Sequence, residues 1–257
     1  MPIVSPLPPS RALPTHYGAL VTATYDIPPH LAARATVVVL PGRGEDAAVY
    51  QRLGLRLSFD AYRVHVLDDP TGDPAAATAT VKALLADEAA PHVLLGSDTG
   101  ALFAALLVAE RSVTVQGLVL AGLPVGQASQ VEQDWDAELE ARTTCPTHRA
   151  RLTDDSEFQR GALWTAPPAD WIERANPTAI PVPVLGVHGA ADTLSTVDDV
   201  RDWYGRLPHG ELISLADTAH DALNNQTHRT AAAVVVRFLE RLRLGSDLPT
   251  IERVEAL

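Results

Sequence analysis

The chain has 257 residues, of which 46% are hydrophobic and 20% are charged, enough for one large α/β domain with a substantial core. Its formal net charge of −12 argues against nucleic acid and anionic membrane surfaces as partners. Cys145 is the only cysteine, which excludes an intrachain disulfide and a cysteine metal cluster, and no apolar run approaches the roughly 20 residues that span a membrane.

The remaining patterns predict strands that alternate with helices. Met1 to Pro14 is rich in proline and is expected to form an extended arm. It lacks the basic start and long apolar core of a signal peptide, so we expect a cytoplasmic protein. Alternating or continuous apolar runs predict strands at 17–25, 36–40, 62–67, 92–95, 115–121, 181–188 and 211–215. Apolar residues at helical spacing predict helices at 47–57, 75–87, 101–110, 196–204 and 229–244.

This alternation predicts an α/β fold, in which a mainly parallel sheet is covered by helices on both faces. The rhythm breaks between Gly122 and Ile180, a charged segment that holds three of the four tryptophans. We therefore assign residues 1–121 and 181–257 to the core and 122–180 to an insertion above the strand ends, where such sheets bind ligands. We expect the insertion to be a lid over the site, the alternative being a helical flap that only covers an edge.

The stretch from Pro91 to Glu110 predicts a strand, a tight turn and a helix, with the turn sequence GSDTG at 96–100. This is the context of a nucleophile elbow, whose central residue is strained and whose neighbours must be small. The central residue is Asp98, so the reactive group would be a carboxylate. One alternative is an ordinary turn in which Asp98 caps the helix. Another uses Ser97 as the nucleophile in a turn shifted by one residue, which the flanking glycines disfavour.

Two later residues complete the chain order nucleophile, acid, histidine. Asp192 follows a predicted strand in VHGAAD, and His220 lies between the last predicted strand and the terminal helix. A carboxylate that orients an imidazole toward a nucleophile is the logic of a catalytic triad. The chain has nine histidines, and the others have no matching context, so we expect them to be surface or packing residues.

With these residues the chain resembles the α/β-hydrolase family from Thr36 to Leu244, nearly its whole length. The motifs that carry the resemblance are LPGRGE at 40–45, YRVHVLDDP at 62–70, GSDTG at 96–100, VHGAAD at 187–192, and His220 with its following helix. The resemblance implies an oxyanion hole formed by the backbone N–H groups of Arg43 and Thr99. Pro41 stands where the family usually has histidine.

An aspartate at the elbow resembles the haloalkane dehalogenase and epoxide hydrolase branch of the family. That resemblance implies that Asp98 attacks an electrophilic carbon and forms an alkyl ester, after which His220, held by Asp192, activates the water that hydrolyses the ester. The sequence departs from the branch at Thr99, where dehalogenases have the tryptophan that binds halide. The insertion also lacks the lid tyrosines with which epoxide hydrolases usually open the ring.

The group that assists the leaving group is therefore open. Candidate donors are Trp135, Trp164, Trp171, Arg160 and His148. We expect the three tryptophans to bind substrate. Tyr50, which follows the oxyanion loop, is a further candidate substrate contact, with packing as its alternative role.

The function expected is hydrolysis of a small apolar electrophile, such as an epoxide, through an Asp98 ester. The alternative within the same fold is an esterase-like, lyase or cyclising enzyme that uses Asp98 and His220 as acid and base. A further alternative is a homologue that binds a ligand without turnover. We expect a small-molecule substrate and no metal or cofactor, because no metal cluster or phosphate-binding glycine loop is evident. The oligomeric state is open, a homodimer included.

Overall fold

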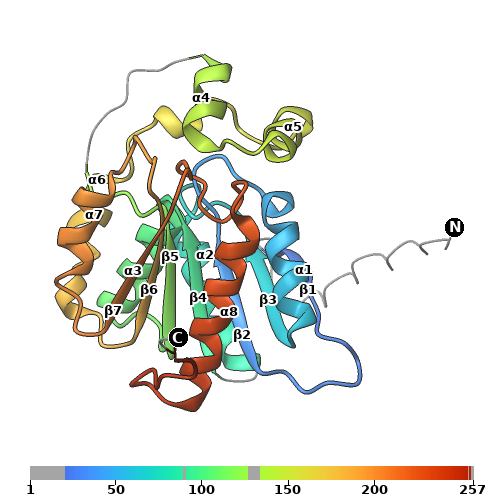
Figure 1. Cartoon of the computed structure of the whole chain (residues 1–257), viewed down its shortest axis with the longest axis vertical. Coiled ribbons are helices and arrows are strands. Elements are labelled where there is room, and N and C mark those ends of the chain that lie inside the picture. The colour runs from blue at the N-terminus through green and yellow to red at the C-terminus, as the bar shows by residue number, and fades with distance from the viewer. Residues whose placement is uncertain (1–20, 89–90, 127–133, 254, 256–257) are drawn as a thin grey trace, which may run out of the picture.

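Seven strands form one sheet in the order β1-β3-β2-β4-β5-β6-β7 in the computed structural model, which describes residues 21–88, 91–126, 134–253 and 255 (Figure 1). The strands are β1 (Val21–Tyr25), β2 (Ala35–Leu40), β3 (Tyr62–Leu67), β4 (His92–Ser97), β5 (Gly117–Ala121), β6 (Val184–Gly189) and β7 (Gly210–Leu215). Strand β1 is antiparallel to β3, and the other neighbouring pairs are parallel. The predicted α/β fold with a mainly parallel sheet is confirmed. The predicted arm at 1–14 lies outside the described residues.

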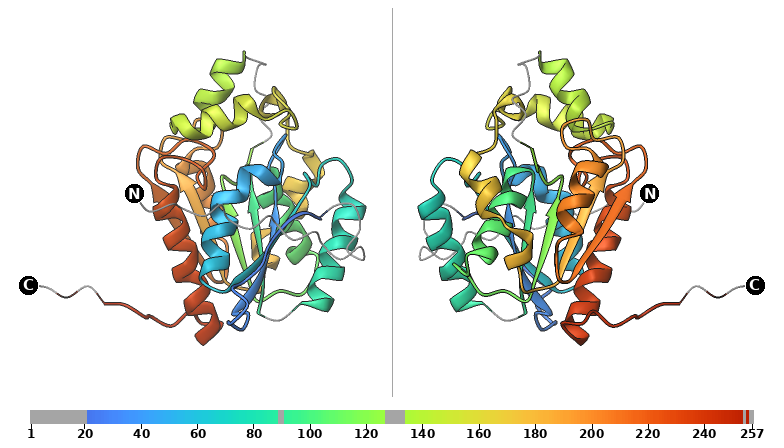
Figure 2. Two further views of the ribbon diagram at one scale, coloured as in Figure 1. Left: turned by 90° about the vertical axis from the view of Figure 1, so that its right-hand side faces the viewer. Right: turned by 90° about the vertical axis from the view of Figure 1, so that its left-hand side faces the viewer.

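Helices cover both faces of this sheet. The α-helices described are α1 (Gln51–Phe59), α2 (Pro74–Asp87), α3 (Thr99–Ala109), α4 (Trp135–Arg142), α5 (Pro146–Asp154), α6 (Ala169–Arg174), α7 (Val197–Tyr204) and α8 (His228–Leu244). Short 3-10 turns lie at η1 (Ala47–Tyr50), η2 (Ala162–Trp164) and η3 (Pro177–Ala179). Figure 2 shows α8 and α2 on opposite sides of the sheet. None of the described helices is long and apolar enough to cross a membrane.

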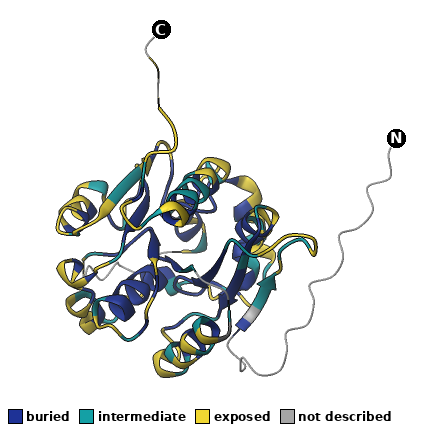
Figure 3. Cartoon of the chain, turned by 90° about the horizontal axis from the view of Figure 1, so that it is seen from below, coloured by how far each residue is buried: buried dark blue, intermediate teal, exposed yellow. Residues whose placement is uncertain are grey.

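The sequence of β2 explains why it lies inside the sheet, between β3 and β4. Alternate side chains of a strand point to opposite faces. Val37 and Val39 pack in the core on the α1 and α8 side, whereas Val38 and Leu40 pack on the α2 and α3 side. All four are fully buried, and each contributes roughly 1.5–3 kcal/mol of hydrophobic stabilisation. In Figure 3 the sheet and the inner helix faces are buried, and the outer helix faces are exposed.

Two glycines let α3 cross the sheet closely at the end of β4. A Cβ atom on Gly100 would lie 2.0 Å from the carbonyl oxygen of Leu40, and one on Gly96 would lie 2.3 Å from the carbonyl oxygen of Gly100. Neither separation is possible for real atoms, so any larger side chain would push the helix away from the strand. The close crossing fixes Asp98, midway between these glycines, at the edge of the sheet.

The predicted insertion divides into two parts, and residues 127–133 within it lie outside the described residues. Helices α4 and α5 lie above the sheet in Figure 1, at the edge where β5 ends. Helix α6 and the turn η3 pack instead against α3. The assignment of the whole segment 122–180 to a lid remains a prediction; its described first half lies where a lid is expected.

Candidate active site

Asp98 occupies the apex of the turn between β4 and α3. Its backbone has φ 48° and ψ −122°, a conformation that non-glycine residues rarely adopt. The N–H of Asp98 donates to the carbonyl of Ala121 at 2.9 Å, so the neighbouring strand holds the strained peptide in place. The Asp98 side chain makes no capping hydrogen bond to α3, which differs from the capping alternative. Ser97 is the last residue of β4 and precedes the apex.

The structure brings Asp192 and His220 to this apex from the ends of β6 and β7. His220 Nδ1 lies 2.8 Å from Asp192 Oδ2, and His220 Nε2 lies 3.3 Å from Asp98 Oδ1. The second oxygen of Asp192 accepts the N–H groups of Leu194 and Ser195 at 2.9 and 3.1 Å, which fixes the carboxylate. The side chains of Asp98, Asp192 and His220 are all buried. The arrangement is a carboxylate, an imidazole and a second carboxylate in line.

His188 is a neighbour of this line that the sequence analysis treated as a surface or packing residue. Its Nε2 lies 3.2 Å from Asp192 Oδ2 and 2.6 Å from the carbonyl oxygen of Ser195. Because a carbonyl only accepts, Nε2 of His188 carries the hydrogen. His188 therefore donates to the Ser195 carbonyl, and the same nitrogen lies beside the Asp192 oxygen that His220 contacts. Its place in VHGAAD, near the end of β6 and four residues before Asp192, was the signal that could have identified it.

Arg43 is the principal partner of Asp98. Its backbone N–H donates to Asp98 Oδ2 at 3.0 Å, in the direction predicted for an oxyanion-hole donor. Its side chain adds a bidentate ion pair, with Nε 2.7 Å from Oδ2 and Nη2 2.7 Å from Oδ1. Nη1 of Arg43 donates to the carbonyl of Thr165 in the insertion. Sequence reasoning gave Arg43 only the backbone role, so the ion pair is a new element of the site.

Thr99 is the second predicted oxyanion donor and is the first residue of α3. The N–H groups of the first helical turn have no partner within the helix, which leaves such a group available to an anion. The Thr99 hydroxyl is fully buried and has no hydrogen-bond partner in the described part of the chain. Its role as a donor remains a prediction.

The charges of the site follow from these contacts. Burial raises the pKa of Asp98, but Arg43 and His220 outweigh it and hold that pKa well below its usual range. Burial likewise opposes ionisation of Asp192, but His220 and His188 hold its pKa below the usual range. Burial lowers the pKa of His220, yet Asp192 and Asp98 raise it to about 10. The resting site at neutral pH is thus an imidazolium between two carboxylates.

A second buried ionic cluster lies beside the first and centres on Arg142 of α4, which is fully buried. Its Nε lies 3.1 Å from Glu138, and its Nη1 lies 3.7 Å from Glu45 and 3.6 Å from Asp221. Nη2 of Arg142 donates to the carbonyl of Arg43 at 2.8 Å. Burying a charge is unfavourable unless it is paired, so these contacts tie α4 firmly to the loop that carries Arg43.

Tyr50, predicted to contact substrate, is 1% exposed and supports the same loop. Its hydroxyl donates to Glu45, which also accepts the N–H of Gly42 at 2.8 Å. Burial and the charge of Asp221 raise the pKa of Glu45 to about 7, although Arg142 opposes the shift. The contacts of Tyr50 are those of the packing alternative, and a substrate contact remains a prediction.

A cavity of about 260 Å³ adjoins the site. It is lined by Arg43 and Thr99 from the core and by Gln159 and Thr165 from the insertion. Asp98 does not line it, whereas Arg43 contacts both the cavity and the Asp98 carboxylate. Arg43 therefore stands between this cavity and the carboxylate.

The three tryptophans of the insertion have different surroundings. The Trp135 ring lies 5.8 Å from that of Phe158 and is covered by the guanidinium of Arg160. Trp164 is buried, and its indole N–H has no hydrogen-bond partner among the described residues. Trp171 packs in the core with its ring 4.7 Å from that of Phe103. The contacts of Trp171 are packing contacts, because α6 lies against α3, and its substrate role remains a prediction.

The two other candidate donors are also engaged elsewhere. His148 is buried, with Nε2 3.2 Å from Asp221. Arg160 donates to the carbonyl of Thr153 at 2.7 Å. Within the described ranges, no group of three or more histidine, cysteine, aspartate or glutamate side chains has the arrangement of a metal site.

Comparison with solved structures identifies the fold. A monoacylglycerol lipase from Paleococcus ferrophilus superposes with a TM-score of 0.70 at 16% identity, over 84% of this chain and 96% of that one. A monoglyceride lipase from Saccharomyces cerevisiae gives a TM-score of 0.70 at 13% identity, over 86% and 91%. The enol-lactonase from Burkholderia xenovorans gives 0.62 at 18% identity, over 84% and 94%. A scan against family models and a search of curated proteins gave no match. The chain has the α/β-hydrolase fold.

Proposed function

We propose that this protein is a hydrolase that opens a small apolar electrophile, such as an epoxide, through an ester on Asp98. The observation that carries the proposal is the ionised Asp98 carboxylate at a strained elbow, 3.3 Å from an imidazole that a second carboxylate holds. A carboxylate needs no base to activate it, so the histidine is free to serve the water. Structures that share the fold include two lipases and a lactonase, which agrees with hydrolysis as the reaction class.

In the proposed reaction the two oxygens of Asp98 have different tasks. Oδ2 receives the backbone N–H of Arg43 and is the oxygen that would carry negative charge when the ester is hydrolysed. Oδ1 faces His220 and is the oxygen that attacks carbon. A donor aimed at the developing oxyanion contributes typically 2.7–4 kcal/mol, about 10²–10³ in rate.

The proton needed for ring opening has a source in the same line of residues. As Oδ1 of Asp98 forms its bond to carbon, the carbon–oxygen bond of the epoxide breaks and an alkoxide develops. The imidazolium of His220 transfers its proton to that alkoxide, which supplies the acid that the absent lid tyrosines provide in the resembling enzymes. The guanidinium of Arg43, which binds the same carboxylate, is close enough to stabilise the negative charge that develops on the alkoxide.

The first step prepares the second. Esterification removes the negative charge of Asp98, one of the two carboxylates that raise the pKa of His220. The neutral imidazole then takes a proton from water, which attacks the ester carbonyl at Cγ of Asp98. Collapse of the tetrahedral intermediate releases the diol, restores the Asp98 carboxylate and leaves His220 protonated, so the cycle closes with one water consumed.

A second candidate keeps the fold and uses Asp98 and His220 as acid and base, in an esterase-like, lyase or cyclising reaction. The observation that favours it is the bidentate ion pair, because both oxygens of Asp98 are occupied by Arg43. An ester substrate also suits the acid–base reaction better than the reaction through an Asp98 ester. Attack of a carboxylate on an ester would give a tetrahedral adduct, from which the carboxylate leaves more readily than the alkoxide, so the mixed anhydride would not form efficiently.

Isotope labelling separates the two candidates. With styrene oxide as substrate, multiple turnovers in ¹⁸O water place ¹⁸O in the Asp98 carboxyl group if the ester forms, because the attacking water joins Cγ. Trypsin releases residues 83–111, and fragmentation of this peptide locates the label. A His220→Ala variant should accumulate the covalent adduct on Asp98. Turnover without label in Asp98 would contradict the ester and support the acid–base reaction.

A further inference from the structure

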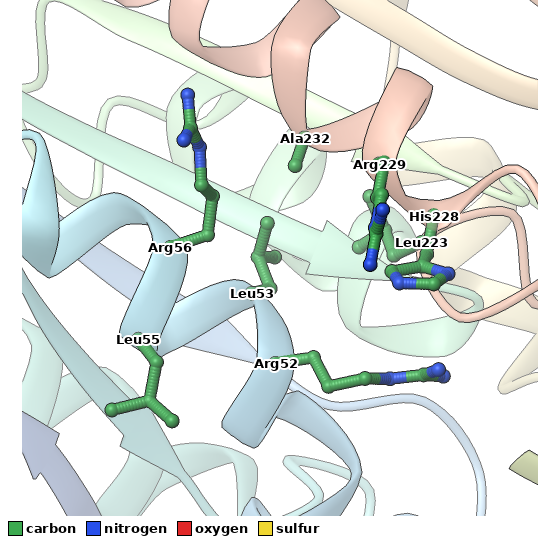
Figure 4. A pocket seen from close by; sticks show the side chains of 8 residues that line it. All are labelled: Arg52, Leu53, Leu55, Arg56, Leu223, His228, Arg229 and Ala232. Carbon is green, nitrogen blue, oxygen red and sulfur yellow. The ribbon is translucent and has the colours of Figure 1, made fainter. Parts of the chain in front are cut away.

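A cavity of about 480 Å³ lies between α1 and the start of α8, separate from the one beside Asp98 (Figure 4). Its apolar floor, as we call it, consists of Leu53, Leu223 and Ala232. Its basic rim consists of Arg52, Arg56, His228 and Arg229. The volume is that of a small-molecule site. None of these residues takes part in the proposed reaction, and the inference below does not rest on that reaction.

The charge of the rim contrasts with the charge of the chain. The chain carries a formal net charge of −12, yet the lining of this cavity holds three arginines and no carboxylate. Arg56 pairs with Asp60 at 3.1 Å at the edge of the cavity, and Arg52 donates to the carbonyl of Asn224 at 3.0 Å. Arg229 has no acidic partner among the described residues. The rim therefore has cationic groups whose charge the described residues do not balance.

Figure 4 shows how these cations are arranged: the side chain of Arg229 lies next to the His228 ring, and Leu53 lies between Arg56 and Arg229. Burial, followed by the charges of Arg52 and Arg229, lowers the pKa of His228. Burial is the larger cause, and the two arginines add to it. Cationic groups from α1 and from the start of α8 therefore line the same cavity.

The apolar residues of the cavity indicate that its ligand has an apolar part in addition to a negative charge. Leu53, Leu223 and Ala232 are buried to 4%, 3% and 7% exposure, while Leu55 at the cavity edge is 42% exposed. The apolar surface that a ligand can still cover is therefore mainly that of Leu55, beside the floor. A hydrated inorganic anion would leave that surface exposed, whereas an aliphatic chain would cover it and gain about 0.8 kcal/mol per buried methylene.

We propose that this cavity binds an aliphatic carboxylate, with the anionic group at the basic rim and the chain on the apolar floor. The planar guanidinium groups match a carboxylate through paired N–H donors. Charge complementarity selects the headgroup, and the apolar floor selects the chain.

The test compares three ligands that separate these two parts. Isothermal titration calorimetry on the full chain at low ionic strength would use octanoate, octan-1-ol and acetate. We expect octanoate to bind at least tenfold more tightly than either of the others, because octanol lacks the charge and acetate lacks the chain. Equal affinity for octanoate and octanol would overturn the proposal, as would equal affinity for octanoate and acetate.

Charge-reversal variants test whether octanoate binds at the basic rim of this cavity. Arg56→Glu with Arg229→Glu reverses two exposed rim charges and should weaken octanoate at least tenfold while octanol binding changes less than twofold. The matched control reverses Arg237 and Arg243, which lie on α8 outside the cavity, and should change octanoate affinity less than twofold. If the control weakens octanoate as much as the rim variant, the effect is one of net charge and the proposal fails. The single variant Arg229→Gln provides the same comparison if the double variant does not fold.

Discussion

Replacing Asp98 with asparagine should lower the pKa of His220 sharply. The substitution keeps the shape of the side chain and removes the negative charge whose oxygen lies 3.3 Å from His220 Nε2. At that distance, and with an effective dielectric constant of about 20, the attraction is about 5 kcal/mol. The guanidinium of Arg43, left without its carboxylate, pushes the pKa in the same direction. At about 1.36 kcal/mol per pH unit, we expect a fall from about 10 by about 3–4 pH units.

The measurement is an NMR titration of the imidazole ring, with the His220 resonance identified from its absence in a His220→Gln variant. Asp69→Asn is the matched control, because Asp69 lies near Arg43 but does not contact His220, and it should leave the titration in place. A pKa that stays near 10 in Asp98→Asn would refute the idea that loss of this charge turns His220 from an acid into a base.

Three further predictions concern the stability of the site. Arg43→Ala leaves the buried carboxylate of Asp98 without its main partner and should lower the free energy of unfolding by about 3–5 kcal/mol in urea, whereas Arg43→Lys should lose less. Because the pKa of His220 is about 10 folded and 6.5 unfolded, its imidazolium stabilises the fold fully below pH 6.5. That contribution, at most about 5 kcal/mol, should disappear as the pH rises through 10, as urea titrations from pH 6 to 10 would show. Gly100→Ala places a Cβ 2.0 Å from the Leu40 carbonyl and should destabilise by more than about 3 kcal/mol or prevent soluble expression; an unchanged melting temperature would contradict the close crossing.

The sequence was sufficient for the sheet and for the order of its elements. The run YRVHVL predicts β3 with the bounds that the structure has, because a short β-branched run between turns has few other solutions. Helix α3 begins at Thr99 rather than at 101. Gly100 is unfavourable in an isolated helix, but only a glycine fits against the Leu40 carbonyl, and this tertiary contact outweighs propensity.

The electrostatic surroundings of the site could not be predicted in the same way. The resemblance of LPGRGE to the oxyanion loop of the family implies a backbone donor at Arg43, but the direction of its side chain depends on the Thr165 carbonyl, 122 residues away. Arg142 and Glu45 meet through packing of α4 on the loop, and no local pattern marks such an encounter. The packing of Trp171 against Phe103 could not be predicted either, because an aromatic residue in an insertion carries no sign of which element it will face.

The guanidinium of Arg43 has one further consequence for how catalysis and access are related. It is hydrogen-bonded to Asp98 and to the Thr165 carbonyl at once, while its own carbonyl is held by Arg142. In the proposed reaction the ester would remove the charge of Asp98, whereas the contacts of Arg43 with the Thr165 carbonyl and with Arg142 do not depend on that charge. Arg43 therefore links the charge state of the reactive carboxylate to the insertion that borders the cavity.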